Sequence, residues 1–165
     1  MEKIIYPLPS IIDDKHNTKE NKALYQMACE IMRENKLLIL TGSLALVMRG
    51  HKLRRQPKDI DFLYPYDKGW EKPKDWFDAG GYDYPIQNGF EPKLYVYQDV
   101  EINVMIPNQY INVFNIIKAS IHGFPRWVRE ESILRFKTEF AFNEDGNPTK
   151  HREDLAYFFT NNTRL

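Results

Sequence analysis

Two aspartates stand one residue apart in the apolar stretch KDIDF, residues 58–62. A strand over residues 58–64 projects alternate side chains from the same face, so Asp59 and Asp61 share one side of it. Their backbone positions would lie roughly 6–7 Å apart. Like charges this close repel each other, and Mg²⁺, a hard cation that bridges protein carboxylates to substrate phosphates, relieves that repulsion. The pair therefore predicts metal-assisted phosphate chemistry.

A glycine-serine pair precedes these aspartates in the stretch LTGSLALVMRG. The apolar run LLILT, residues 37–41, is typical of a short buried strand, and SLALVMRG is typical of a short helix that ends at Gly50. Gly42 lets the backbone approach a phosphate closely, and Ser43 offers a hydroxyl and an N–H group at the start of that helix. We expect this turn to bind an anion.

A third carboxylate comes from VEINV, residues 100–104. Strand alternation puts Val100, Ile102 and Val104 on one face and leaves Glu101 with Asn103 on the other. If this strand lies beside the one over residues 58–64, Glu101 adds a third acid to the site. A pair of metal ions held there would activate an attacking oxygen and stabilise a leaving pyrophosphate.

The stretch GSLALVMRGHKLRRQPKDIDF resembles the opening motif of the polymerase-β-like nucleotidyltransferases, and is closest to their minimal, abortive-infection (AbiEii-type) branch. The resemblance implies that Gly42 and Ser43 bind a triphosphate. It also implies that Asp59, Asp61 and Glu101 are the catalytic metal ligands, with Glu101 as a base for the incoming hydroxyl.

The resemblance extends into the stretch ILRFKTEFAFNEDGNPTKHREDLAYF, and spans residues 37–160 in all. It implies that Lys137 approaches the nucleotide phosphates and that Lys150 and Asp154 shape the far wall of the nucleotide site. The chain departs from the family pattern in two places. His-Arg-Glu separates Lys150 from Asp154, and the third acid is Glu101 where aspartate is commoner.

The resemblance thus implies transfer of a nucleoside monophosphate from a nucleoside triphosphate to an acceptor hydroxyl, with release of pyrophosphate. The implied cofactor is Mg²⁺, as two ions, with Mn²⁺ as a substitute. The acceptor stays open between an RNA 3′ end, a protein side chain and a small alcohol. A toxin-like or phage-defence role would add a cognate antitoxin as partner.

Two other functions are compatible with the sequence. The first is a catalytically inactive module of the same fold that binds a nucleotide or a protein partner. The second is a structural protein whose acids bind Ca²⁺, against which the glycine-serine turn argues. The basic side chains between the two motifs fit either a solvated loop or a phosphate or nucleic-acid contact; they are Arg49, His51, Lys52, Arg54, Arg55 and Lys58.

The remaining pattern predicts an α+β (α/β-like) fold, with a mixed sheet followed by helices. The resemblance implies that this is the nucleotidyltransferase fold, with a twisted sheet of about five strands flanked by helices. We expect one domain, residues 1–165, with an extended arm at residues 1–18 and a helical part at residues 110–165. Helices are predicted over residues 18–35, 112–121, 126–142 and 149–159, with a short one in 73–81, and further strands over 82–87, 93–98 and 100–106.

Composition narrows the class of protein further. The 165 residues carry 23 basic and 23 acidic side chains, which argues against a protein held to nucleic acid by its overall charge. Cys29 is the single cysteine, so an intrachain disulfide is excluded and a reducing compartment is indicated. No signal peptide and no membrane-spanning segment is predicted, and we expect a cytoplasmic protein without a membrane partner.

Overall fold

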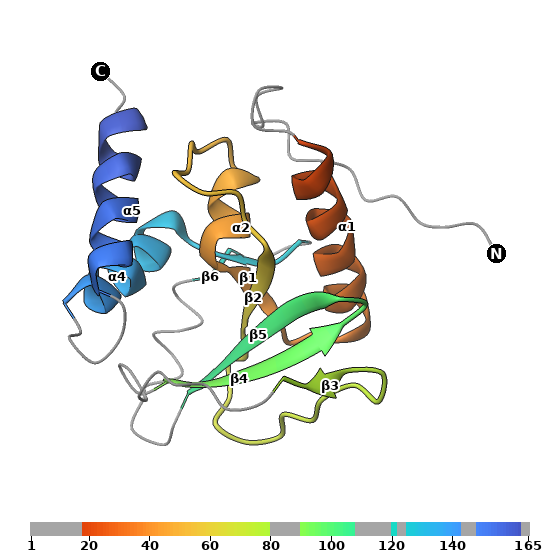
Figure 1. Cartoon of the computed structure of the whole chain (residues 1–165). Helices are drawn as coiled ribbons and strands as arrows, with labels where there is room; N and C mark the ends of the chain where they lie inside the picture. Colours follow the sequence, from red (N-terminus) through yellow and green to blue (C-terminus); the bar gives the residue numbers. More distant parts are fainter. Residues whose placement is uncertain (1–17, 80–89, 108–119, 122–124, 143–147, 163–165) are drawn as a thin grey trace.

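The computed structural model describes residues 18–79, 90–107, 120–121, 125–142 and 148–162. It is a mixed α+β structure in which helices flank one twisted sheet (Figure 1). The helices are α1 (Lys19–Glu34), α2 (Gly42–Val47), α4 (Glu130–Ala141) and α5 (Pro148–Asn161). The strands are β1 (Ile39–Thr41), β2 (Asp59–Leu63), β3 (Phe77–Asp78), β4 (Phe90–Tyr97), β5 (Val100–Pro107), β6 (Ser120–Ile121) and β7 (Trp127–Val128).

Over the described residues, the sheet has seven strands in the order β3-β4-β5-β2-β1-β7-β6, where the sequence predicted about five. The additional strands β3, β6 and β7 are each only two residues long, so they are too short to show an alternating pattern. The α+β class is confirmed. The strands that carry the three predicted acids, β2 and β5, are neighbours in the middle of this sheet.

Strand β2 is the central element of the sheet. It pairs antiparallel with β1 and parallel with β5, and its Ile60 and Phe62 side chains are fully buried. Burial of this apolar face fixes the register, because a shift by one residue would expose both side chains. The same alternation leaves the two aspartates of β2 on the opposite, half-buried face.

Strands β4 and β5 form an antiparallel hairpin. Gln98 and Asp99 make its two-residue turn, both with positive φ (50° and 63°), as a type I′ turn requires. The separate strands predicted over residues 93–98 and 100–106 are therefore confirmed. The first of them begins earlier than predicted, since β4 starts at Phe90.

Helix α1 begins where the sequence predicts. The Thr18 hydroxyl caps it by accepting a hydrogen bond from the Asn21 amide at 3.1 Å. Its buried face includes Tyr25 and Cys29, which confirms the cysteine as a core residue. At the other end, the Arg126 guanidinium donates to the carbonyls of Met32, Asn35 and Leu38, which have no partner within the helix.

Helices α4 and α5 lie side by side at one side of the molecule, and α1 lies at the other side (Figure 1). Helix α2 stands in the middle, between this pair and α1 (Figure 1). The Arg152 side chain of α5 donates to the Ala141 carbonyl at the end of α4, at 2.7 Å. In the ranges that the structure describes, none of the helices is both long enough and apolar enough to span a bilayer.

Three predicted helices differ from the structure. In the short helix predicted for 73–81, the described residues 73–79 make one turn, in which the Trp76 amide donates to the Pro73 carbonyl, and then strand β3. Packing of the buried Trp76 ring against Tyr95 overrides the helical pattern. The helix predicted from residue 126 begins only at Glu130, because Trp127–Val128 pairs with β1 and β6. Residues 120–121, the end of the helix predicted for 112–121, form strand β6.

Some predictions lie outside the described residues. These are the extended arm at residues 1–17, the strand over residues 82–87, and residues 112–119 of the predicted helix. The division of the chain into a single domain stays a prediction.

Candidate functional site

The three predicted acids lie on one face of the sheet. Asp59 and Asp61 project from β2, and Glu101 stands on β5 directly opposite Asp59 in the parallel ladder. The strand pairing that the site requires is therefore present. Asp61 is half-buried and Glu101 is exposed, so the acidic face runs from the interior of the sheet towards solvent.

Asn103 lies between the two aspartates. It stands opposite Asp61 on β5, and its side-chain amide donates to Asp61 Oδ1 at 2.8 Å and to Asp59 Oδ2 at 3.2 Å. Sequence reasoning placed Asn103 on the acidic face but assigned it no role. The alternation of residues 100–104 was the signal that could have identified it.

The electrostatics of this face favour a cation. Burial, and next the charge of Asp59, raise the pKa of Asp61 to about 7, although the Asn103 amide and the charge of Lys137 act in the opposite direction. Burial, and then a hydrogen bond with Asp59, raise the pKa of Glu101, which the charge of Lys150 lowers. The ionised forms of these carboxylates are therefore disfavoured without a cation, and a bound cation would favour them.

Gly42 and Ser43 form the corner against which the acidic face packs. Gly42 has φ +73°, a conformation that residues with a side chain rarely adopt. A Cβ atom on Gly42 would overlap the Asp61 carboxylate and lie 2.9 Å from the Asp61 Cβ. Both the backbone angle and the contact with Asp61 therefore require glycine at this position.

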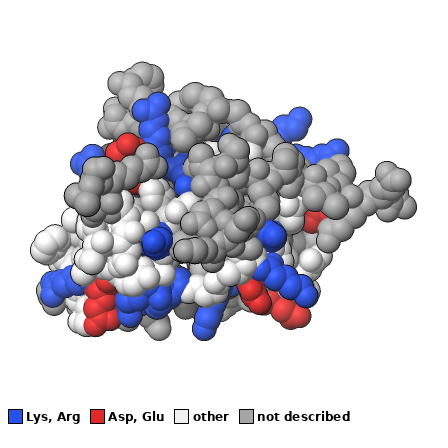
Figure 2. All heavy atoms as spheres, turned by 90° about the horizontal axis from the view of Figure 1, so that it is seen from above, with Lys and Arg blue, Asp and Glu red and all other residues white. Residues whose placement is uncertain are grey.

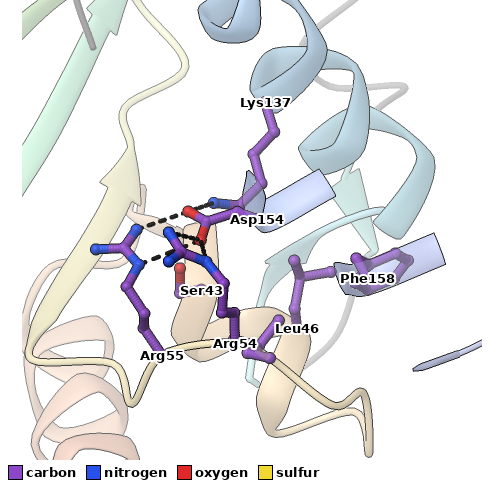
Figure 3. Close-up of a pocket in the computed structure, with 8 residues that line it drawn as sticks. Ser43, Leu46, Arg54, Arg55, Lys137, Asp154 and Phe158 are labelled. Carbon is purple, nitrogen blue, oxygen red and sulfur yellow. Dashed lines mark hydrogen bonds and ion pairs between the residues drawn. The ribbon is translucent and has the colours of Figure 1, made fainter. Parts of the chain in front are cut away.

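Cationic side chains gather on the other side of Ser43. Arg54, Arg55 and Lys137 all direct their charged ends at the Asp154 carboxylate (Figure 3). The closest contacts are 3.0 Å from Arg54, 2.6 Å from Arg55 and 4.0 Å from Lys137. Burial alone would raise the pKa of Asp154, but the hydrogen bond from Arg55 and the charge of Lys137 lower it.

These charged groups line a shallow, open cavity together with Ser43 and the apolar side chains of Leu46, Leu53 and Phe158. Lys137 is 16% exposed, and burial lowers its pKa while the charges of Asp154 and Asp61 oppose that effect. An anion in this cavity would meet three cations and one carboxylate.

Lys150 and His151 stand at the start of α5. The Lys150 charge acts on Glu101 and on Lys137, which places it beside the acidic face. The predicted site residues of the turn, the two strands and the two C-terminal helices are thus brought into one region. Arg54 and Arg55, which the sequence left open between a solvated loop and a phosphate contact, reach into the cavity (Figure 3).

The residues on this face fit a hard divalent cation. No three His, Cys, Asp or Glu side chains of the described ranges stand together as a ready metal site. Mg²⁺, however, is commonly held by one or two carboxylates and completed by water and substrate phosphates. Asp59 and Asp61 supply such a pair, and the buried Oδ1 of Asn103 beside them has no hydrogen-bond partner in the part of the chain that the structure describes. Glu101 as a third metal ligand stays a prediction.

The surface around the site is locally basic although the chain is neutral overall. Lys52, Arg54, Arg55 and Lys58 of the loop that leads into β2 are all exposed. Among the described residues visible from above, lysine and arginine cover more of the surface than aspartate and glutamate (Figure 2). An anionic ligand would be attracted to this face by charge.

Comparison with known proteins gives a distant match. No family model matches the sequence, and no curated protein matches it significantly. Among solved structures, the chain is similar to the crystal structure of a proposed nucleotidyltransferase from H. pylori, with 15% sequence identity and a TM-score of 0.39. The match covers 82% of this chain, which spans 62% of the length of the other. A likeness this distant carries no functional inference, which rests on the side chains described above.

Proposed function

We propose that this chain is a Mg²⁺-dependent nucleotidyltransferase, which transfers a nucleoside monophosphate from a nucleoside triphosphate to an acceptor hydroxyl. One observation carries the proposal: Asp61, from the Asp-x-Asp strand, packs directly against Gly42 of the Gly-Ser turn. The predicted cation-binding and phosphate-binding elements therefore meet, as transfer of a phosphoryl group requires.

The phosphate tail would lie in the cavity beside Ser43. The hydroxyl of Ser43 faces it, and Lys137 and Arg55 supply positive charge from the opposite wall. Lysine and arginine bind phosphate oxygens through charge-assisted hydrogen bonds. Bound between the acidic pair and the tail, Mg²⁺ would neutralise charge on the phosphate oxygens.

The reaction is an in-line displacement. The acceptor oxygen forms a bond to the α-phosphorus, and the bond from that phosphorus to the bridging oxygen breaks, so that pyrophosphate leaves. The proton of the acceptor hydroxyl passes to a carboxylate of the acidic face, and Glu101 suits this task because burial and Asp59 raise its pKa. Positioning and charge neutralisation supply most of the rate.

The narrower assignment, to the abortive-infection branch with a cognate antitoxin, rests on the opening motif and belongs to the proposal. The exposed basic loop supports a short RNA end as acceptor over a small alcohol, because its cations could contact a sugar-phosphate backbone. A protein side chain is the remaining acceptor class.

The second candidate is an inactive module that binds a nucleotide. One observation favours it: among the described residues, no three His, Cys, Asp or Glu side chains stand together as a ready metal site. Such a module would bind nucleoside triphosphate without releasing pyrophosphate.

The test is incubation of the purified protein with each α-labelled nucleotide, Mg²⁺ and a cell extract. We expect a labelled acceptor and release of pyrophosphate from the wild type, and loss of both by at least ~10³-fold in the double variant Asp59→Asn, Asp61→Asn. The matched control is Asp67→Asn, the same change at an exposed loop position. Nucleotide binding without pyrophosphate release in every acceptor mixture would establish the inactive module instead.

A further inference from the structure

Asn103 is the polar residue of the acidic face that the proposed chemistry does not use. Its one side-chain nitrogen donates to both aspartates, at 2.8 Å to Asp61 and 3.2 Å to Asp59. An amide nitrogen carries two hydrogens, so both bonds can form at once without competition. Asn103 therefore joins the two carboxylates in the geometry that the structure shows.

The backbone alone does not fix where the two carboxylates point. The ladder between β2 and β5 holds the Cα atoms of Asp59, Asp61 and Asn103 in register, but each aspartate can still rotate about its side-chain bonds. Mutual repulsion would turn the carboxylates apart. A neutral donor between them opposes this rotation without adding a charge that would compete with a cation.

The bridge uses one oxygen of each carboxylate. Asn103 contacts Oδ1 of Asp61 and Oδ2 of Asp59, so the second oxygen of each carboxylate is free of this amide. Outer groups that donate to metal-binding carboxylates orient them in this manner, and their loss typically weakens metal binding by about 10–100-fold.

We propose that Asn103 is a positioning residue that holds Asp59 and Asp61 in the orientation in which they share one divalent cation. The inference rests on the cation binding that the proposed function also needs, but it does not depend on nucleotide transfer. Asn103 acts through the two aspartates by hydrogen bonding, and the strand ladder keeps it in place.

The test measures Mn²⁺ binding to the purified full chain by electron paramagnetic resonance, without nucleotide. Asn103→Leu keeps the size of the side chain and removes the donor, and we expect the Kd for Mn²⁺ to rise at least about tenfold. If that variant does not fold, Asn103→Ala removes the donor without adding bulk, and the same rise is expected. The control Asn35→Leu removes a side-chain amide that donates to Ile31 at 2.9 Å, and should leave the Kd for Mn²⁺ unchanged.

An unchanged Kd for Mn²⁺ in a folded Asn103 variant would overturn the inference, because a residue that only packs would change stability alone. Failure of the proposed function looks different: wild-type protein would bind Mn²⁺ and lose affinity in Asn103→Leu, but would transfer no nucleotide. Absence of Mn²⁺ binding in the wild type would overturn both.

Discussion

At the scale of single residues, Gly42 couples the backbone to the site. Its φ of +73° and the contact with Asp61 each exclude a side chain. We expect Gly42→Ala to lower the free energy of unfolding by at least ~1–2 kcal/mol from the backbone angle alone, measured by urea denaturation. We also expect weaker Mn²⁺ binding, since the new Cβ must displace the Asp61 carboxylate.

Gly69→Ala is the matched control for this prediction. Gly69 also has a positive φ, +92°, but among the described residues a Cβ there would meet only the Tyr64 hydroxyl, at 3.2 Å. That variant should lose stability and keep its affinity for Mn²⁺. If both variants changed the affinity for Mn²⁺ equally, the contact of Gly42 with Asp61 would not be what matters for cation binding.

The residues of the site were predictable to the extent that their local pattern encodes them. Asp59, Asp61, Gly42 and Ser43 follow from strand alternation and a turn, which are local features. Strand alternation put Asn103 on the same face as Glu101, but its role was missed because it depends on the parallel pairing of β2 and β5, which no single stretch of sequence encodes.

At the scale of elements, side chains of helix α5 and of the residue after it hold the basic loop that leads into β2, residues 51–58, by hydrogen bonds. Asp154 accepts hydrogen bonds from Arg54 and Arg55, and the Asn162 side chain bonds both the N–H and the carbonyl of Lys52, at 2.7 and 2.9 Å. This loop runs directly into Asp59. These hydrogen bonds therefore help to position the start of β2, the strand that carries the two aspartates.

We expect Asp154→Asn to lower the free energy of unfolding by about 1–2 kcal/mol, because it removes a charged acceptor shared by two arginines that remain partly solvated. Faster amide hydrogen exchange in residues 51–58 would locate the change. Glu153→Gln is the control, since its 56% exposed carboxylate pairs with Arg54 alone and should contribute less than ~0.5 kcal/mol. If both variants lost the same free energy of unfolding, Asp154 would not be the residue that holds this loop on α5.

Elements were predictable where a long periodic pattern meets a clear boundary. Helix α1 has both, a buried stripe and a cap at Thr18, and α5 was also predicted. Strands β3 and β7 were missed because they are two residues long and depend on pairing, β3 with β4 and β7 with β1 and β6. The sheet supplies hydrogen bonds that override the helical preference of such short segments.

At the scale of the whole molecule, two half-buried groups respond to pH in opposite senses. The pKa of Asp61 is raised to about 7, first by burial and next by the charge of Asp59. The pKa of His151 is lowered to about 4, first by burial and then by the charges of Lys137 and Lys150. Between pH 4 and 6.5 the folded protein therefore keeps a proton on Asp61 and lacks one on His151, whereas the unfolded chain does the reverse.

The slope of stability against pH follows from the protons bound in each state. Without metal, Asp61 makes the protein less stable as pH rises from about 4 to about 7, and His151 makes it less stable as pH falls from 6.5 to about 4. Each contribution is at most about 1.4 kcal/mol per pH unit, so the two largely cancel in the wild type.

Single variants should separate the two contributions. Relative to the wild type in chelator-containing buffer, Asp61→Asn should gain stability as pH rises from 4 to 7, and His151→Asn should gain stability as pH falls from 6.5 to 4. Urea denaturation across this range measures both, and other titrating groups drop out of the difference because each variant retains them. A constant difference between Asp61→Asn and the wild type would mean that Asp61 is already ionised without metal. Lys137 would then neutralise the acidic face, and the electrostatic reason for a divalent cation at this site would be lost.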